Sequence, residues 1–489
     1  MSTGPRIGKD EWVAREGEQR EVRTGVLGLG DKIAARVPWW ALLILFLALC
    51  SLLPVVSSNG YIRRVAFDTV IYMLLALGLN VVVGWGGLLD LGYVAFFGFG
   101  GYAYAILSSD QFRAQASHHG IHVPTLLVFP VVVALTALLG FLLGLTSWRL
   151  VGDYLAIVTL FFGQAFLTFL INGSSVFQTG LNLTNGSQGI SNVDPLSFFG
   201  HALPVSHAGV FNVAYLYVAL ALFAVVYAAL RFVNDSRTGR AWRALREDPL
   251  AAEVMSMPVD RLKLLAFAFG AAVAGLTGTL FAALNAGVFP QNFDTPLLIT
   301  VYAMVILGGA GSQKGVVLGA IVIWVMLEAL RSSDHSRWVF YGAIVLGLIG
   351  AMRPWRKLAI VLGGTAALGF AVHAVAQAID ATWTGGSPQG GDAVARAASH
   401  WVVIPSAFGR GHALAYIALI GIALFVTTLK GWARVAVLIP TLYLAAFVWE
   451  NVMSADPAAT RYVLLGALLV GVMTTRPAGL LGETRVEIV

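Results

Sequence analysis

Long apolar segments recur along the whole chain, and they limit what it can fold into. Of the 489 residues, 58% are hydrophobic and only 11% are charged, whereas roughly a quarter of the residues of a soluble domain are charged. Inside the hydrocarbon of a membrane, every backbone N–H and C=O group must find a partner within the protein. Separate apolar segments meet this requirement by forming helices. The sequence therefore predicts an all-α fold, a polytopic helical membrane protein with about 14 membrane segments. These segments are expected at about 39–56, 65–84, 86–107, 124–146, 152–171, 213–231, 264–287, 296–310, 315–331, 338–352, 358–378, 413–429, 435–452 and 462–475.

Basic residues sort the loops between these segments into two sets. If residues 1–37 form a cytoplasmic N-terminal tail, roughly three quarters of the 31 Lys and Arg residues fall on the cytoplasmic side, as the positive-inside rule requires. The same layout leaves the C-terminus in the cytoplasm. We expect a multi-pass protein of the bacterial cytoplasmic (inner) membrane, with a transmembrane domain at 38–357 and an additional transmembrane module at 358–489.

A polar stretch, Arg231–Lys263, interrupts the apolar pattern and cannot cross a bilayer. It contains seven basic and five acidic residues. Good helix formers across 240–247 predict one short helix. Asp248 as N-cap and Pro249 at the first helical position begin a second, which Pro258 is expected to end. Two interpretations stay open: arginines lying on anionic lipid headgroups, or a docking element for a soluble partner.

Two other apolar regions, Gly84–Ala105 and Val305–Ala320, are interrupted by glycines. Paired interruptions of this kind indicate discontinuous helices that line a transport pathway. The polar residues that accompany the first region favour this interpretation, because polar groups are costly inside a membrane and usually mark a functional site. The alternative is that small residues only permit close helix packing. The candidate pathway residues from these regions are Asn80, Gly84, Gly86, Gly87, Asp90, Gly92, Gly98, Gly308, Gly309 and Gly311.

Several classes of function find no support in the sequence. Cys50 is the single cysteine, so no disulfide framework and no cysteine metal site is expected. The run GGAGSQKG at 308–315 lacks the spacing of an ATP-binding phosphate loop. The net charge of +6 is spread over loops as an orientation signal and does not indicate nucleic-acid binding. A histidine cluster at 118–122 is expected to be a solvated loop, with a metal site as the alternative.

Two late segments, 337–354 and 461–477, share a leading arginine, a glycine five positions later and a closing Arg-Pro. This pattern indicates an internal repeat, or else a chance likeness between two apolar helices. Glu328, His373 and Glu450 lie near segment ends, and we expect them at the membrane interface.

Several motifs in register resemble one family, the branched-chain amino acid ABC importer permeases of the LivM type. The resemblance covers about 65–358, and RPAGLLG at 476–482 is similar to the family's C-terminal ending. Because both 338–352 and 462–475 resemble the family's last helix, the true equivalent is left open. The motifs are GLNVVVGWGGLLDLGYVAFFGFGGYAYA (78–105), RLVGDYLAIVTLFFG (149–163), LTNGSQGIS (183–191), SRTGRAWRALREDPLAAEVMSM (236–257), KLLAFAFGAAVAGLTGTLFA (263–282) and MVILGGAGSQKGVVLGA (304–320).

The resemblance implies a transport subunit that is not itself an enzyme. Its partners would be a second permease subunit, two cytoplasmic ABC ATPases and a periplasmic or extracellular solute-binding protein that docks over the loop at 172–212. No cofactor is expected in this chain, because ATP and Mg²⁺ would bind to the ATPase subunits. The implied cargo is a branched-chain or other hydrophobic amino acid. The alternatives are a permease for urea or short amides, and an ATP-independent secondary transporter or channel.

The resemblance also assigns roles to residues of the polar stretch and of the first glycine region. The family's Glu-Ala-Ala…Gly coupling signature falls on Leu250, Ala251, Ala252 and Ser256, so its first and last positions depart from the pattern. Tyr93, Phe96 and Phe97 would give a hydrophobic amino acid an apolar path. The residues expected to couple the protein to an ATPase are Arg240, Arg243, Arg246, Glu247, Asp248, Pro249, Ala251, Ala252 and Ser256.

Overall fold

A computed structural model of the chain describes most of its residues. The described ranges are 38–112, 121–147, 150, 152–174, 182–198, 201–204, 211–331, 333–351, 355–387, 393–406, 411–429, 431–453 and 457–482. The predicted N-terminal tail, His118 and His119 lie outside these ranges. The chain forms two compact units: residues 1–322 with 472–489, and residues 323–471. The boundaries fall within the helices α13 (Gln313–Ala329) and α19 (Pro457–Thr475).

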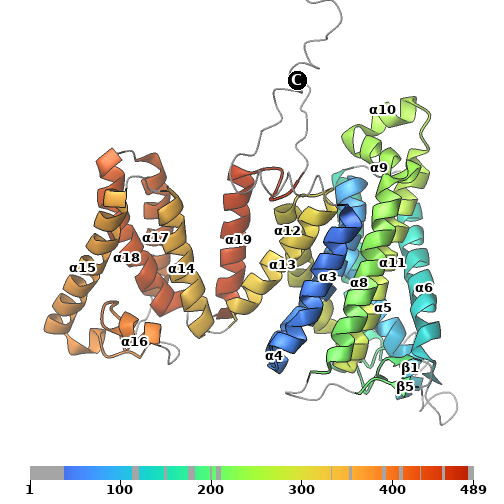
Figure 1. Cartoon of the computed structure of the whole chain (residues 1–489), viewed down its shortest axis with the longest axis horizontal. Helices are drawn as coiled ribbons and strands as arrows, with labels where there is room; N and C mark the ends of the chain where they lie inside the picture. Colours follow the sequence, from blue (N-terminus) through green and yellow to red (C-terminus); the bar gives the residue numbers. More distant parts are fainter. Residues whose placement is uncertain are drawn as a thin grey trace, which may run out of the picture. The chain divides into compact units, whose positions relative to one another are not determined.

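The first unit is a bundle of helices with short strands at one end (Figure 1). Its helices and strands are α3 (Trp39–Val56), α4 (Gly60–Leu79), the π-helix η1 (Asn80–Trp85), α5 (Tyr93–Leu107), β1 (Ser108–Ser109), η2 (Asp110–Phe112), β2 (Ile121–His122), α6 (Thr125–Ser147), α7 (Asp153–Asn172), η4 (Gly186–Gln188), β3 (Ile190–Ser191), β4 (Ser197–Phe198), β5 (His201–Ala202), α8 (Val213–Asp235), α9 (Arg237–Glu247), α10 (Pro249–Val254), α11 (Val259–Asn285), β6 (Gly287–Val288), η5 (Pro290–Phe293), α12 (Thr295–Gly308) and the start of α13.

Helix α11 forms the centre of this unit and packs against α4, α5 and α6. Small residues on α11 permit the close approach. A Cβ at Gly278 would collide with the carbonyl of Phe97 and lie 2.7 Å from the backbone nitrogen of Gly101, both on α5. Gly275 and Gly100 meet in the same way. The core of the unit therefore depends on backbones in near contact, as small-residue packing in membranes allows.

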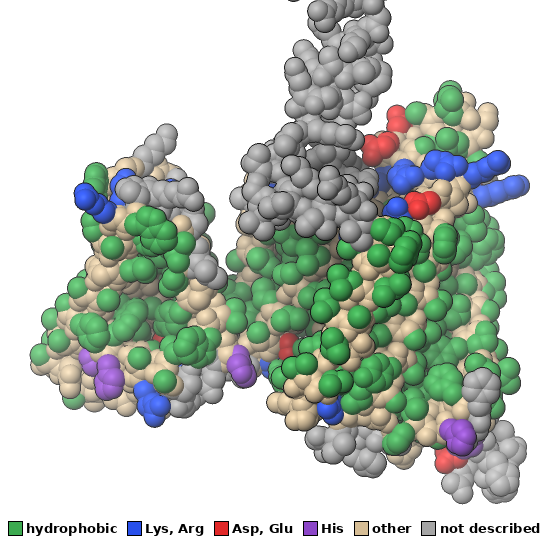
Figure 2. Space-filling model, viewed as in Figure 1, with side chains coloured by type: hydrophobic (Ala, Val, Ile, Leu, Met, Phe, Trp, Pro, Cys, Tyr) green, Lys and Arg blue, Asp and Glu red, His purple; other side chains and the backbone are tan. Residues whose placement is uncertain are grey.

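Polar elements gather at the two ends of this unit. Figure 1 shows α9 and α10 at one end and the strands β1 and β5 at the other. In Figure 2, arginine, lysine and acidic side chains gather at the α9–α10 end, while the flanks of the unit are largely hydrophobic. Three antiparallel two-stranded pairs form: β1 with β2, β3 with β6, and β4 with β5, with Ser108 opposite His122, Ile190 opposite Val288 and Ser197 opposite Ala202.

The second unit is also helical (Figure 1). It contains the remainder of α13, α14 (Ser333–Ala351), α15 (Trp355–Ile379), η6 (Ala381–Trp383), α16 (Ala393–Ser399), α17 (Gly411–Thr428), α18 (Gly431–Val448), the π-helix η7 (Trp449–Met453) and most of α19. Helix α18 packs against α15 and α17.

A buried ion pair lies inside the second unit. Arg337 and Glu450 are both fully buried, and Nε and Nη2 of the arginine each donate at 2.9 Å to one carboxylate oxygen. The hydroxyl of Tyr341 donates at 3.1 Å to the same carboxylate. The expected interface position of Glu450 stays a prediction, but its carboxylate is buried in the protein and paired with an arginine from a helix far away in the sequence, as a buried carboxylate requires.

Eight described helices are long and apolar enough to cross a membrane, and four more are apolar but shorter. The prediction of a polytopic helical membrane protein is confirmed, and the number of fourteen segments stays a prediction. The eight long spans are Trp39–Val56, Gly60–Trp85, Thr125–Thr146, Asp153–Asn172, Val213–Asp235, Val259–Asn285, Trp355–Ile379 and Gly431–Val452.

Close packing between α5 and α11 predicts a large effect of one methyl group. We expect Gly278→Ala to lower the free energy of unfolding by about 1–3 kcal/mol, because the added carbon meets backbone atoms that cannot rotate away. Thermal melting of the purified protein in detergent measures the effect. Gly363→Ala on α15 is the matched control, since a Cβ there meets nothing within 4 Å. Equal melting temperatures for the two variants would contradict the packing argument.

Removal of one charge from the buried pair should destabilise the second unit. We expect Glu450→Ala to cost about 3–5 kcal/mol, because it leaves Arg337 buried without its carboxylate. The double variant Arg337→Met with Glu450→Met should be less harmful than Glu450→Ala alone. Melting curves of both variants test this, and a double variant at least as unstable as the single one would contradict it.

Candidate functional site

The polar stretch folds as the predicted pair of short helices. Ser236 caps α9, since its Oγ accepts from the backbone nitrogen of Gly239 at 3.4 Å. Asp248 caps α10 by accepting from the nitrogens of Leu250 and Ala251 at 2.9 and 3.0 Å, with Pro249 at the first helical position. These caps confirm the predicted start of the second helix, as expected of Asp followed by Pro.

The end of α10 differs from the prediction. The helix stops at Val254, and Pro258 instead caps α11. Between them, Ser256 adopts a φ of 61°, in the left-handed region that favours glycine. Ser256 stands at the glycine position of the coupling signature, and its backbone adopts a conformation that glycine takes more easily.

One face of the α9–α10 pair points outward. Among the predicted coupling residues, Arg240, Arg243, Glu247, Asp248, Pro249, Ala251 and Ser256 are exposed. Three apolar side chains on and just after α10 are also exposed, Leu250 by 74%, Val254 by 84% and Met255 by 74%. A cavity of about 660 Å³ lies beside α10 and the first residues of α11. Charged and apolar side chains thus share one exposed surface, a composition suited to docking a protein.

The opposite face of α9 packs against the membrane helices. Trp242 is fully buried, and its indole nitrogen donates to the carbonyl of Leu262 on α11 at 2.8 Å. Its ring stacks on Trp85 of η1, with 6.2 Å between centroids and 20° between planes. Ala252 is buried on α10. The sequence analysis missed Trp85 and Trp242, although the spacing of Trp242 and Leu245 places both on one face of a helix.

Arg246 also points inward and contacts both glycine regions. Its Nη1 donates to the carbonyl of Gly84 at 2.5 Å and to that of Ala310 at 3.3 Å. The two regions bond to each other as well, because Asn80 Oδ1 accepts from the nitrogen of Gly311 at 2.7 Å. Trp85 donates its indole hydrogen to the carbonyl of Gly311 at 2.9 Å. We call this set the Arg246 junction: Asn80, Gly84, Trp85, Trp242, Arg246, Ala310 and Gly311.

The first glycine region is an irregular stretch between η1 and α5. Asp90 is fully buried, and its Oδ1 accepts from the nitrogen of Gly92 at 2.9 Å. The carbonyl of Asp90 accepts from the hydroxyl of Tyr302 on α12 at 2.6 Å. Tyr93 donates to the carbonyl of Leu75 at 3.0 Å. Buried bonds therefore hold the helix break in one conformation.

Aromatic side chains continue this region along α5. Phe96 and Phe97 are buried, and the ring of Phe97 meets Phe281 and Phe293 edge to face at 5.4 and 5.2 Å. Gly98 lies against the ring of Phe166, where a Cβ would be 2.7 Å from it. The predicted aromatic path residues thus lie in the interior of the first unit, and their role in transport stays a prediction.

The second glycine region is a tight turn between α12 and α13. A Cβ at Gly308 would collide with the carbonyl of Gly315, and one at Gly319 would collide with that of Met304. These contacts are what the close-packing interpretation expects. The C-terminal segment 476–482 packs on the same turn: the nitrogens of Leu480 and Leu481 donate to the carbonyls of Leu307 and Gly308 at 2.8 and 3.0 Å.

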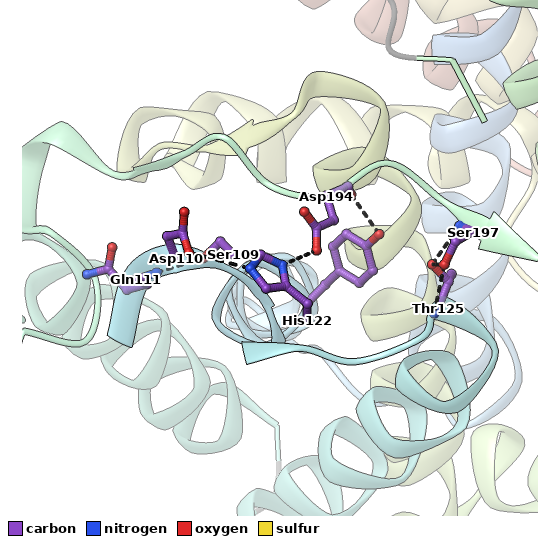
Figure 3. A network of polar contacts seen from close by, with 8 residues as sticks. Ser109, Asp110, Gln111, His122, Thr125, Asp194 and Ser197 are labelled. Carbon is purple, nitrogen blue, oxygen red and sulfur yellow. Dashed lines mark hydrogen bonds and ion pairs between the residues drawn. The ribbon is translucent and has the colours of Figure 1, made fainter. Parts of the chain in front are cut away.

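A polar network occupies the other end of the unit (Figure 3). His122 Nδ1 lies 2.5 Å from Asp194 Oδ2, and its Nε2 lies 3.4 Å from Asp110 Oδ1. Tyr104 donates to the carbonyl of Asp194 at 2.9 Å. The network joins the β1–β2 pair to the loop that contains Asp194, which belongs to the predicted external loop at 172–212. His122 therefore holds two loops together, which the sequence analysis did not foresee.

Comparisons with known proteins agree with this architecture. Residues 61–352 match the family described as branched-chain amino acid transport system / permease component. The chain is 38% identical over 346 residues to the high-affinity branched-chain amino acid transport system permease protein LivM of Escherichia coli (strain K12), which covers 65% of this chain and 76% of that protein. It is 28% identical over 269 residues to a probable branched-chain amino acid transport permease protein LivM of Methanocaldococcus jannaschii, covering 52% and 72%.

A second kind of permease is also similar. The permease protein LivH of the high-affinity branched-chain amino acid transport system of Escherichia coli (strain K12) is 24% identical over 288 residues, covering 57% of this chain and 88% of that protein. No solved structure matches the chain.

The His122 network predicts a pH dependence. The carboxylate of Asp194, helped by Asp110, raises the pKa of His122 above its ordinary value. Both ring nitrogens face carboxylates, so the doubly protonated form fits the site best. A raised folded-state pKa gives stability that is present below about pH 6.5 and is lost as pH rises through the folded pKa. Because the side chains are exposed, we expect at most about 1 kcal/mol, weakened by salt.

Melting temperatures of wild type and His122→Gln between about pH 5.5 and pH 9 test this prediction. The advantage of the wild type should shrink as pH rises, because neutral His122 loses its attraction to both carboxylates. An advantage of the same size at every pH would contradict it.

Proposed function

Because this chain belongs to the permease component family of branched-chain amino acid transport systems, we propose that it is the membrane subunit of an ATP-driven importer for branched-chain or other hydrophobic amino acids. The observation that carries the proposal is the two-sided α9–α10 pair. Its outer face offers charged and apolar groups to a soluble partner, and its inner face bonds to both glycine regions. Such an element can convert docking of a partner into movement of membrane helices.

The soluble partner proposed for the outer face is one of two cytoplasmic ABC ATPases, which would bind ATP and Mg²⁺. Exposed Arg240 and Arg243 supply positive charge, and Val254 and Met255 supply apolar anchors. A protein interface uses both, with apolar anchors at its centre and charges at its rim. A helix pair that rests on lipid also combines arginines with apolar side chains, so copurification of the ATPase is the measurement that separates the two interpretations.

The other partners follow from the two ends of the first unit. A periplasmic or extracellular solute-binding protein would dock at the end opposite α9, over the loop that the His122 network holds to the β1–β2 pair. A second permease subunit would complete the membrane part, in line with the likeness to both kinds of permease. The α9–α10 end would face the cytoplasm of a bacterial cell, with the protein in the inner membrane.

The proposed cargo agrees with the chemistry of the helix break. Phe96 and Phe97 line its continuation with aromatic surface, and Asp90 is the acidic group buried there. Such a region suits the apolar side chain of a branched-chain amino acid, whose ammonium and carboxylate groups still need polar partners. Selectivity among hydrophobic amino acids would then lie mostly in the solute-binding protein.

A docking variant tests the proposal. We expect Arg243→Glu with Val254→Glu to leave membrane insertion intact but to reduce the ATPase that copurifies with the protein by about tenfold or more, since the double change removes an apolar anchor and reverses a charge. Quantitative mass spectrometry of the tagged complex, purified in mild detergent, measures the ratio. Arg396→Glu on exposed α16 of the second unit is the matched control.

Three outcomes decide between the interpretations. Loss of ATPase in the docking variant alone supports the proposal. Unchanged ATPase in that variant would favour the lipid-headgroup interpretation of α9 and α10. A wild-type protein that purifies without ATPase and moves leucine into vesicles without ATP would overturn the importer proposal and indicate a secondary transporter or channel.

A further inference from the structure

We propose that Arg246 is a positioning residue that ties α9 to the ends of two membrane helices, so that a movement of α9 displaces both glycine regions together. This inference rests on the proposed function and gives Arg246 a role inside the protein, separate from docking. It differs from the expectation that Arg246, together with Arg240 and Arg243, couples the protein to the ATPase. The inference is carried by the bonds of one guanidinium to two distant backbone segments.

The acceptors of Arg246 are carbonyls that their own helices leave available. Gly84 lies next to the last residue of η1, and Ala310 lies in the turn after α12. The last carbonyls of a helix have no donor within that helix. The carboxyl end of a helix also carries partial negative charge, which attracts a cation. Two helix ends therefore converge on one guanidinium that is suited to both in charge and in hydrogen bonding.

The carbonyls at the end of α12 and in the turn after it receive hydrogen bonds from two segments, the C-terminal segment and α9. The backbone nitrogens of Leu480 and Leu481 bond to the carbonyls of Leu307 and Gly308. Arg246 donates to the carbonyl of Ala310, two residues beyond Gly308. The C-terminal segment and α9 thus complete the same helix end, and Arg246 supplies the bond that links it to α9.

The backbone around the guanidinium leaves room for it. A Cβ at Gly311 would collide with Nη1 of Arg246, and one at Gly87 would lie 3.0 Å from its Cγ. Both glycines have positive φ, of 95° and 65°. A Cβ at Gly84 would collide with Oδ1 of Asn80, the atom that bonds to Gly311. The junction is therefore built around an arginine, whose Nη1 donates to both carbonyls.

Mechanically, the junction connects three elements through short bonds. Trp242 anchors α9 to α11 and stacks on Trp85, and Trp85 bonds to the turn after α12. If an ATPase displaces α9, Arg246 carries that displacement to η1 and to the α12–α13 turn. Without the guanidinium, α9 could still dock but would move the two helix ends less effectively. ATP hydrolysis would then continue while transport falls.

The test compares Arg246→Gln, Arg246→Lys and the control Arg237→Gln, which removes the same charge from the exposed first turn of α9. Each permease is purified with its ATPases, reconstituted with solute-binding protein into vesicles and supplied with radiolabelled leucine and ATP. The quantities measured are leucine uptake per ATP hydrolysed, ATPase copurification and melting temperature. The ratio of uptake to hydrolysis is a readout that a purely structural role would not change.

We expect Arg246→Gln to keep its ATPase and to lower uptake per ATP by about tenfold or more, the effect of losing a hydrogen bond to a charged group. Arg246→Lys should give an intermediate ratio, because it keeps the charge but not the planar guanidinium with its fixed donor directions. Arg237→Gln should match the wild type. If Arg246→Gln does not fold, the ratio for Arg246→Lys decides: a wild-type value overturns the inference.

Other results separate this inference from the proposed function. A wild-type ratio in Arg246→Gln would overturn the positioning role while leaving the importer intact. Loss of the ATPase from Arg246→Gln would overturn it too, because Arg246 would then be a docking charge. A wild-type complex without ATPase, or one that carries leucine without ATP, would show instead that the proposed function itself has failed.

Discussion

Backbone carbonyls at the ends of interrupted helices need hydrogen-bond donors, because an apolar interior offers none. In the first unit the Arg246 junction is one of the places that meet this need. There, Arg246 donates to the carbonyls of Gly84 and Ala310, and the indole of Trp85 donates to the carbonyl of Gly311. The side-chain oxygen of Asn80 accepts from the backbone nitrogen of Gly311. This requirement explains why the polar helix α9 packs against the membrane helices and why glycines lie beside Arg246. It also explains why the C-terminal segment bonds to the end of α12.

The same need accounts for the polar groups that lie elsewhere in the two units. Asp90 accepts a backbone hydrogen inside the helix break, and Glu450 accepts two bonds from Arg337 within the second unit. Both carboxylates are buried, but only that of Glu450 has a cationic partner at bonding distance among the described residues. The pair of Arg337 and Glu450 is a structural bond that joins α14 to η7, and breaking such a buried pair is costly.

Local patterns in the sequence predicted a large part of this architecture. The apolar segments, the caps of α10 and the motifs of the permease family depend on neighbours in the chain, so they can be recognised without coordinates. The two faces of α9 could have been separated in the same way from the spacing of Trp242, Leu245 and Arg246 on one side and Arg240 and Arg243 on the other. The pairing of Glu450 was not predicted because its partner, Arg337, lies far away in the sequence.

Sequence alone established that the chain is a polytopic helical membrane protein of a permease family with a polar helix pair between its spans, because length, hydropathy and capping are local properties. Only the tertiary structure decided which groups the inward-facing and loop residues contact. It placed Arg246 on Gly84 and Ala310, brought residues 480 and 481 to α12, and paired His122 with Asp194. Each of these contacts joins segments distant in the chain, and their geometry follows from how the helices pack, which no local pattern encodes.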